Sequence, residues 1–282
     1  MMFGTREEFT YASCSACGTL RLLDVPPDMG RFYGGDYYST RQDFRRWVRR
    51  HDFVYRLAHL VMVRRLPSLP EWWPAQHSSH AARVLDVGSG AGNLLLRLRS
   101  LGFTNLLGID PFNPEDVDYG RGLHILKQSL DQTDGQFDVV VMNHSFEHVP
   151  EPLSVLRRIR NLLAVGGVVV IRTPIAGSWA MHEYGADWIQ LDAPRHLFVH
   201  SEQGLTQLAR NAGLQVDRCE YDSTALQFWA SEQYRRGIPF TSKSRIFSRS
   251  EMREFTRRAD DLNRRRDGDQ AWFHLSPAGP HV

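Results

Sequence analysis

The segment with the clearest capacity for chemistry reads Val-Leu-Asp-Val-Gly-Ser-Gly-Ala-Gly-Asn and spans residues 84–93. Gly88 and Gly90 allow the backbone to turn sharply and to approach a ligand without an intervening Cβ atom. The apolar spacing that follows is typical of a helix, whose first turn presents unpaired N–H groups and a partial positive charge. We therefore expect a strand, a glycine-rich turn and a helix to form a ligand site here.

Three details of this turn narrow the class of ligand. A phosphate-binding P-loop requires a lysine after its last glycine, and the segment contains none. The dinucleotide fingerprint requires Gly-x-Gly-x-x-Gly, whereas Gly92 comes one position early and Asn93 occupies the last slot. Asp86, two residues before the first glycine, would repel a pyrophosphate but could receive an ammonium group. These details favour a zwitterionic, nucleoside-like ligand.

With these residues the chain resembles the class I S-adenosylmethionine-dependent methyltransferases, in particular the branch with a Cys-rich N-terminal segment and a Pro-Arg-His roof element. The hallmark Asp-x-Gly-x-Gly-x-Gly is matched at 86–92, and an acid that closes the second strand is matched by Asp110. The third mark is Phe-Asp-Val-Val-Val at 137–141, followed by Glu-His-Val-Pro at 147–150. The resemblance covers residues 13–240 and implies methyl transfer with S-adenosyl-L-methionine (SAM) as cofactor.

The resemblance also implies where the cofactor binds. Asp110 should accept hydrogen bonds from both ribose hydroxyls, and Ser129 and Leu130 fall where family members hold the adenine. Asn143 and His144 end the fourth strand, at the edge where open α/β sheets bind ligands. The complete set of predicted cofactor-binding residues is Asp86, Gly88, Ser89, Gly90, Gly92, Asn93, Asp110, Pro111, Ser129, Leu130, Asn143 and His144.

Histidines are the candidates for acid–base chemistry. An oxygen acceptor with a high pKa needs a base within about 3 Å, and histidine suits that role near neutral pH. His196 is the first candidate, because the related branch has a similar Pro-x-His in the element that covers the donor site. His148 and His144 are the other predicted catalytic residues, although a capping or packing role for His148 is equally open. His182 is a further candidate.

The roof element also carries groups that could contact the acceptor. Trp179 and Trp188 could form an apolar wall that excludes water. Arg172 and Arg195 could hold an acidic or phosphorylated acceptor, or could instead form surface salt bridges. The segment 143–146 reads Asn-His-Ser-Phe rather than Asn-Pro-Pro-Tyr, which disfavours amide or exocyclic base nitrogens as acceptors. Transfer is expected to be metal-independent, because no Asp/Asn trio has magnesium-site spacing.

The pair Cys14-x2-Cys17 resembles half of a zinc ribbon, which needs four ligands. The related branch usually has a second pair upstream, whereas none of the thirteen residues before Cys14 is a cysteine. Cys219 belongs to a predicted strand. We interpret the pair as a vestigial knuckle that packs as a lid; zinc binding would need histidine ligands or a second chain.

Alternating strand and helix patterns begin at residue 83 and would position these groups. Continuous Val/Ile/Leu runs are typical of strands that are buried on both faces. We predict an α/β fold, a Rossmann-like, doubly wound, seven-stranded, mostly parallel sheet with an N-terminal helical and irregular cap. Strands are expected at 84–87, 105–110, 123–126, 137–143, 167–172, 214–220 and 270–275, and helices at 93–98, 152–163, 201–211, 225–236 and 249–266.

The chain is predicted to contain an N-terminal cap at 1–82 and a SAM-binding methyltransferase domain at 83–282, with a roof insertion at 174–200 and C-terminal helices. Residues 40–66 have helical apolar spacing and carry eight Arg against two Asp, a local charge of +6. This segment is interpreted as a lid or core-covering helix, with a dimer contact or a membrane-surface role as alternatives.

Composition limits the function classes. The 282 residues have a net charge of +2 and 42% hydrophobic residues, which suffice for a core and argue against a strongly cationic nucleic-acid binder. No run approaches the ~20 apolar residues of a membrane span, and no signal-peptide core is present, so a cytoplasmic location is expected.

The expected function is O-methylation of a small molecule, such as a sugar, polyketide, quinone-like ring or other natural-product or cell-envelope intermediate. Carbon or amine acceptors come next. The expected partner is the acceptor, without nucleic acid or stable membrane insertion, and a homodimer is possible. The alternatives are an RNA-modifying methyltransferase and a non-catalytic SAM-binding partner protein. A nicotinamide oxidoreductase is a more distant alternative.

Overall fold

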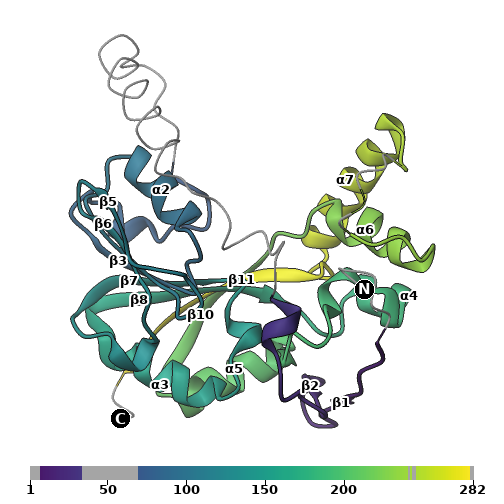
Figure 1. The fold of residues 1–282 in the computed structure, drawn as a ribbon, viewed down its shortest axis with the longest axis horizontal. Coiled ribbons are helices and arrows are strands. Elements are labelled where there is room, and N and C mark those ends of the chain that lie inside the picture. The colour runs from purple at the N-terminus through teal and green to yellow at the C-terminus, as the bar shows by residue number, and fades with distance from the viewer. Residues whose placement is uncertain (1–6, 34–68, 241, 243–245, 280–282) are drawn as a thin grey trace.

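The structure is a computed structural model that describes residues 7–33, 69–240, 242 and 246–279 (Figure 1). The predicted amphipathic helix at 40–66 lies outside the described residues. Among the described helices, none is long and apolar enough to cross a membrane.

A central sheet of eight strands organises the molecule, in the order β10-β11-β8-β7-β3-β4-β6-β5. Strands β6, β4, β3, β7 and β8 run parallel, whereas β5 and β11 are antiparallel to their neighbours. The strands are β3 (Arg83–Val87), β4 (Asn105–Ile109), β5 (Val117–Gly120), β6 (Leu123–Leu126), β7 (Phe137–Asn143), β8 (Leu163–Pro174), β10 (Leu214–Tyr221) and β11 (Gln270–Pro277).

The predicted α/β, doubly wound, mostly parallel sheet is confirmed, but the predicted count of seven strands is wrong. The additional strand, β5, is an edge strand of four residues that forms a hairpin with β6. It has no continuous apolar run, because only Val117 and Tyr119 are apolar. The hairpin turn forms because Gly120, Arg121 and Gly122 all have positive φ, a conformation that the hydrophobic pattern does not reveal.

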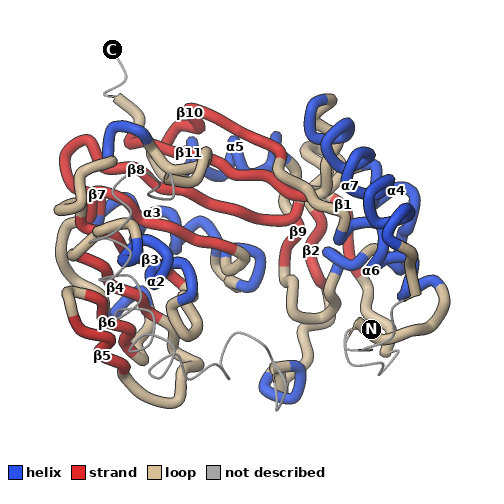
Figure 2. Tube along the Cα trace, turned by 90° about the horizontal axis from the view of Figure 1, so that it is seen from above, coloured by secondary structure: helices blue, strands red, loops and turns tan. Residues whose placement is uncertain are grey.

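Both faces of the sheet are covered by helices (Figures 1 and 2). Along β7, Val140 packs into the core with helices α3 and α5, whereas Val139 and Val141 pack into the core with helix α2. This alternation shows why the strand reads as a continuous apolar run. The helices are α2 (Asn93–Ser100), α3 (Pro152–Leu162), α4 (Trp179–Tyr184), α5 (Glu202–Asn211), α6 (Leu226–Arg235) and α7 (Arg249–Arg264).

Serine caps explain where three of these helices begin. Ser178 and Ser201 accept the backbone N–H groups of Met181 and Gly204 at the starts of α4 and α5. Ser248 and Glu251 form a capping box at the start of α7. The short 3-10 turns are η1 (Gly30–Phe32), η2 (Ala75–His77), η3 (Leu130–Gln132), η4 (Phe146–His148), η5 (Gly185–Asp187) and η6 (Ile189–Leu191).

A second, three-stranded sheet ties the N-terminal segment to the region after β8. Strands β1 (Tyr11–Ser13) and β2 (Leu20–Leu22) form a hairpin, and β2 pairs antiparallel with β9 (Phe198–Val199). The cysteine pair lies in the turn of this hairpin. The N-terminal segment is therefore hydrogen-bonded directly to the end of the predicted roof.

Candidate active site

The glycine-rich turn after β3 crosses toward the end of β4. The N–H groups of Gly88 and Ser89 both donate to the carbonyl of Ile109, at 2.9 and 3.1 Å. The three glycines of the turn have φ values of +76°, +51° and +86°, which glycine adopts without strain. A Cβ atom at Gly88 would lie 2.5 Å from Cβ of Ser145, so the turn packs tightly against the loop after β7.

Asp110 is held at the rim of this turn. Its Oδ2 accepts the N–H of Gly90 at 3.0 Å, and its Oδ1 accepts the N–H of Phe112 at 2.9 Å. Asp86 is buried nearby, on β3. Burial first, and the negative charge of Asp110 second, raise the pKa of Asp86 to about 7. The site thus has closely spaced carboxyl groups, whose mutual repulsion a cationic ligand would relieve.

The other predicted cofactor residues follow the ends of neighbouring strands. Asn143 ends β7, and its buried Oδ1 has no hydrogen-bond partner within the described ranges. Ser129 begins the turn η3 after β6, where its side chain and that of Gln132 form a capping box. Because β6, β4, β3 and β7 are adjacent and parallel, their carboxyl ends form one edge of the sheet. The structure therefore arranges the predicted cofactor residues along one edge.

Glu147 lies next to this edge, in η4, and is completely buried. One carboxylate oxygen lies 3.2 Å from Nδ1 of His144, and the other accepts the hydroxyl of Thr173 at 3.2 Å. Burial alone would raise the pKa of Glu147. The hydrogen bond from His144 and the nearby imidazoles outweigh burial and lower that pKa to about 2. Glu147 is therefore an ionised carboxylate at neutral pH.

The three predicted catalytic histidines gather around Glu147. Nδ1 of His148 and Nδ1 of His196 lie 2.9 and 2.7 Å from backbone carbonyls of the roof, and Nδ1 of His144 faces the Glu147 carboxylate. Carbonyl and carboxylate oxygens only accept hydrogen bonds, so each Nδ1 is the donor. In each neutral ring, Nε2 is therefore the nitrogen with a free lone pair, the atom that can take up a proton.

His196 has the most distinctive surroundings of the three. Its Nε2 lies 3.9 Å from a carboxylate oxygen of Glu147 and 3.7 Å from one of Asp192. Burial first, and repulsion from a protonated His148 second, lower the pKa of His196 to about 4. The ring is thus neutral at pH 7, but two carboxylates are in place to stabilise the imidazolium that proton uptake would form.

The roof around His196 is fixed by buried polar contacts. Arg195 is only 2% exposed and forms an ion pair with Asp192. The hydroxyl of Tyr11 donates to the carbonyl of His196 at 2.7 Å. The interpretation of Arg195 as a surface salt bridge is therefore wrong, because the roof folds its guanidinium inward. Arg172 is half-buried and pairs with Asp222 at 2.6 Å.

The remaining predicted residues make contacts of their own. Trp188 is fully buried and donates its indole N–H to Asp269 at 3.0 Å, whereas Trp179 packs against Phe228. His182 lies on α4, where its Nδ1 is 2.9 Å from the carbonyl of Ser178. The proposed apolar wall stays a prediction.

Glu147, His148 and His196 also have the chemistry of a metal site. Their ligand atoms lie within 4.8 Å of one another, and within the described ranges no other group of three His, Cys, Asp or Glu residues meets this criterion. Two imidazoles and one carboxylate could hold a divalent cation. Spacing along the sequence does not reveal this group, because His196 lies 48 positions after His148. Metal-independent transfer stays a prediction.

The cysteine pair has no further ligand in the part of the chain that the structure describes. Cys14 is exposed and Cys17 is half-buried, and both are free thiols. The carbonyl of Cys17 accepts the hydroxyl of Ser201, which ties the knuckle to the start of α5. These contacts agree with a packing role for the pair.

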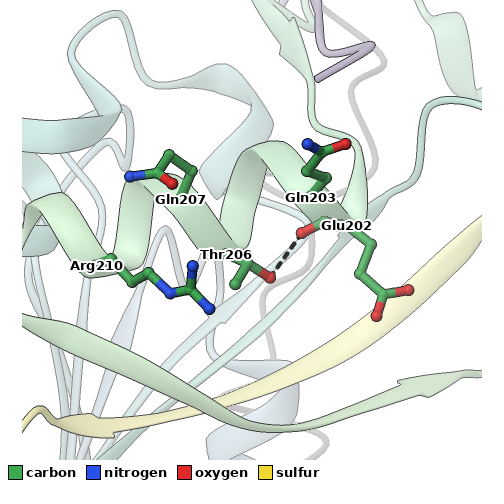
Figure 3. A pocket seen from close by; sticks show the side chains of 5 residues that line it. All are labelled: Glu202, Gln203, Thr206, Gln207 and Arg210. Carbon is green, nitrogen blue, oxygen red and sulfur yellow. Dashed lines mark hydrogen bonds between the residues drawn. The ribbon is translucent and has the colours of Figure 1, made fainter. Parts of the chain in front are cut away.

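A pocket lies on the outer surface of α5 and is lined by side chains of that helix alone (Figure 3). It contains none of the predicted site residues. Because its lining is polar and comes from one helix, it does not bring groups from different elements together. Its lining residues are Glu202, Gln203, Thr206, Gln207 and Arg210.

Residues 64–218 match a protein-family model described as "Methyltransferase domain". The chain belongs to this methyltransferase family. It is 30% identical over 204 residues to the ubiquinone biosynthesis O-methyltransferase of Xanthomonas axonopodis pv. citri, covering 64% of this chain and 77% of the relative. It is 31% identical over 192 residues to the ubiquinone biosynthesis O-methyltransferase of Xanthomonas euvesicatoria pv. vesicatoria. That match covers 61% of this chain and 73% of the relative.

Among solved structures, one similar chain is a Burkholderia thailandensis 1,6-didemethyltoxoflavin-N1-methyltransferase with bound S-adenosylhomocysteine. The identity is 16%, the TM-score is 0.47, and the match covers 97% of this chain and 100% of that chain.

The family membership makes this protein a SAM-dependent methyltransferase, as the glycine-rich turn predicted. The edge of the sheet fits that cofactor. The buried Oδ1 of Asn143 has no hydrogen-bond donor among the residues that the structure describes, and the negative charges of Asp86 and Asp110 repel each other. The ammonium group and ribose hydroxyls of SAM have the complementary chemistry.

Two important members of the site were not predicted from the sequence. Glu147 belongs to the Glu-His-Val-Pro motif but was not predicted to have a role, and Asp192 was not among the predicted site residues. Both carboxylates approach His196 because the loop after β7 and the roof pack together. The sequence does contain one indication of this arrangement. His144, Glu147 and His148 are close enough in sequence that one short turn brings their side chains together.

Proposed function

We propose that this methyltransferase transfers the methyl group of SAM to a hydroxyl oxygen of a small molecule, with His196 as the general base. The supporting observation is the environment of His196, where a neutral imidazole presents its lone pair between Glu147 and Asp192. Such an imidazole can take a proton from a hydroxyl, and the two carboxylates stabilise the resulting charge.

The cofactor is held, in this proposal, by the residues at the ends of β3, β4, β6 and β7. Asp110 accepts hydrogen bonds from the ribose hydroxyls, and Ser129 and Leu130 flank the adenine. Oδ1 of Asn143 accepts from the ammonium group, and the Asp86 carboxylate attracts its charge. When bound, SAM would supply an electrophilic methyl group on its sulfonium, and cleavage of that carbon–sulfur bond would leave the neutral thioether S-adenosylhomocysteine as the second product.

The chain's own residues orient the acceptor and remove its proton. Nε2 of His196 receives the hydroxyl proton as the oxygen bonds to the methyl carbon, while Nδ1 keeps its hydrogen bond to the roof. Glu147 is already ionised and hydrogen-bonded by Thr173, so it responds to the new charge without moving far. His144, which is more exposed, and His148 are the alternative bases.

The proposed acceptor is a hydroxylated aromatic ring. This choice is supported by the names of the two relatives described above, which are ubiquinone biosynthesis O-methyltransferases. Sugar and polyketide hydroxyls, which the sequence also suggested, are the next candidates. We further propose that the protein acts in the cytoplasm on a free small molecule, without a nucleic acid.

The test is a transfer assay with methyl-labelled SAM and a panel of catechols, hydroxybenzoates, sugar nucleotides and total tRNA. The proposal predicts a labelled O-methyl ether from a hydroxylated aromatic compound, and no labelled tRNA. Labelled tRNA alone would support the RNA-modifying alternative. Tight SAM binding without any labelled product would support a non-catalytic partner protein.

A further inference from the structure

Tyr33, from the N-terminal segment, touches both halves of the candidate active site. It follows directly after η1, far in sequence from the sheet that carries the site. Its phenol oxygen lies 3.2 Å from Nδ1 of His148. Its ring stacks on Phe112, with ring centroids 5.7 Å apart and planes only 6° from parallel. One side chain therefore links the turn that carries Asp110 to the histidine cluster.

The contact with His148 has a defined direction. Nδ1 of His148 also lies 2.9 Å from the carbonyl of Arg195, which can only accept a hydrogen bond. Nδ1 must therefore carry a hydrogen. It donates a bifurcated hydrogen bond to the Arg195 carbonyl and to the Tyr33 oxygen. This second acceptor favours the tautomer in which Nε2 of His148 has the free lone pair.

The consequence reaches His196 through ring packing. The rings of His148 and His196 meet edge to face, with centroids 4.8 Å apart. A rotation of His148 would therefore disturb the ring proposed to take up the proton. The phenol is suited to a neutral supporting role, because burial is the main cause that raises the pKa of Tyr33 to about 12.

The stacking contact acts on the other half of the site. Phe112 is 71% exposed, so the ring of Tyr33 covers an aromatic face that otherwise meets solvent. The N–H of Phe112 donates to Oδ1 of Asp110 at 2.9 Å. Stacking on Phe112 thus restrains the turn that orients this carboxylate.

We propose that Tyr33 is a positioning residue for methyl transfer, whose hydroxyl orients His148 and whose ring clamps the Asp110 turn. The inference rests on the proposed function, because it assigns a role at the same site. It gives the N-terminal segment a part in the reaction beyond covering the core. It also separates two effects, one on the transfer rate and one on cofactor affinity.

Three variants test this separation. Tyr33→Phe keeps the ring and removes the hydroxyl, so the rate of methyl transfer should fall about 3- to 12-fold, the equivalent of one hydrogen bond. Its dissociation constant for SAM should stay within about twofold of wild type. Tyr33→Leu and Phe112→Leu should both weaken SAM binding about 3- to 10-fold, because both remove the stack. Of these two variants, only Tyr33→Leu should also slow methyl transfer, because Phe112→Leu keeps the Tyr33 hydroxyl.

The matched control is Tyr221→Phe, which removes a phenol hydrogen bond to Glu202 at 2.9 Å on α5, among residues that line the surface pocket. This variant should leave both rate and affinity unchanged. A Tyr33→Phe enzyme that transfers methyl groups at the wild-type rate would overturn the role of the hydroxyl. Equal losses of SAM affinity in Tyr33→Phe and Tyr33→Leu would contradict the separate roles of hydroxyl and ring, and would show that Tyr33 only supports the local structure.

A measurement without turnover keeps this inference distinct from the proposed function. Nitrogen-15 NMR of labelled histidine reports the tautomer of each ring, with the His148 signals assigned by their loss in His148→Gln. The signals of His148 should shift in Tyr33→Phe and stay constant in Tyr221→Phe. Unchanged His148 signals would refute the inference even in an active O-methyltransferase. A shift in a protein that methylates no hydroxyl would refute only the proposed function.

Discussion

Nε2 of His196 lies 3.9 Å from a carboxylate oxygen of Glu147, a side chain with no exposed surface. The two residues are 49 positions apart and come from different elements, the turn after β7 and the roof after β8. The N–H of Leu197 donates to the carbonyl of Glu147 at 2.9 Å, which joins these elements at the backbone. The pair is therefore built into the fold and places an ionised carboxylate beside a neutral imidazole.

Replacing Glu147 by glutamine should slow methyl transfer. The amide has nearly the same shape but no charge, so an imidazolium at His196 loses an interaction of about 1.5–3 kcal/mol, and the rate should fall about 10- to 100-fold. Steady-state kinetics measure the effect, and the exposed Glu71 provides the control variant Glu71→Gln. A normal rate in Glu147→Gln would show that the carboxylate has no part in the reaction.

The same variant has a stability signature in acid. The pKa of Glu147 is depressed, so its ionisation contributes stability that is present above pH 4.5 and lost as the pH falls toward 2. The free energy of unfolding in urea should therefore differ between wild type and Glu147→Gln at pH 7. The difference should shrink at pH 3. A gap that widens in acid would contradict the assignment.

Asp110→Asn should weaken SAM binding. An amide can accept one hydrogen bond but cannot accept two from vicinal hydroxyls with the strength of a carboxylate, so a loss of at least about tenfold in affinity is expected. Titration calorimetry measures it, with Asp134→Asn as control because that side chain is 97% exposed. NAD should bind to neither variant. Wild-type SAM affinity in Asp110→Asn would remove Asp110 from the cofactor site.

Asp86 makes cofactor affinity depend on pH. Its pKa is raised to about 7 in the free protein, and the ammonium group of SAM favours the ionised form. Affinity should therefore increase about tenfold between pH 6 and pH 8. Over the same interval the free protein should lose stability. The buried Asp86 is favourable only while it is protonated, and it ionises as the pH rises through about 7. Asp86→Asn should flatten both profiles, and a variant that keeps the wild-type slopes would assign them to another group.

His200 should limit stability in mild acid. It is buried and stacks on Phe146 and Phe198, and its Nε2 has no hydrogen-bond partner in the described part of the chain. Burial lowers its pKa to about 4, so the folded state loses stability as the pH falls from 6.5 toward 4. Between pH 8 and pH 5, the free energy of unfolding of His200→Phe should fall by about 1–2 kcal/mol less than that of wild type, as measured by urea unfolding. Equal pH dependence in variant and wild type would show that His200 is not the cause.

The grouping of the proposed cofactor residues was predictable from the sequence for a physical reason. Asp86 is the next-to-last residue of β3, Asp110 directly follows β4, and Asn143 ends β7; parallel strands bring their carboxyl ends to one edge. A continuous apolar run followed by a polar residue is sufficient to locate such positions. The edge strand β5 lacked this run and was missed.

The catalytic half was only partly predictable. Histidines can be chosen as candidates by their chemistry, but which carboxylates face them depends on packing between distant segments. Glu147 is buried because Thr173 and the roof cover it, and Tyr33 reaches His148 from the N-terminal segment. Hydrophobic periodicity carries no information about such contacts, so these residues emerged only from the structure.

The most direct test of the account is a single-turnover measurement with methyl-labelled SAM and the best hydroxyl acceptor, comparing wild type with His196→Gln. Calorimetry first confirms that the variant binds SAM normally. The account predicts methyl transfer slowed by about 10²–10⁴-fold, the usual contribution of a general base, with little change in His182→Gln. Transfer by His196→Gln at the wild-type rate would contradict it.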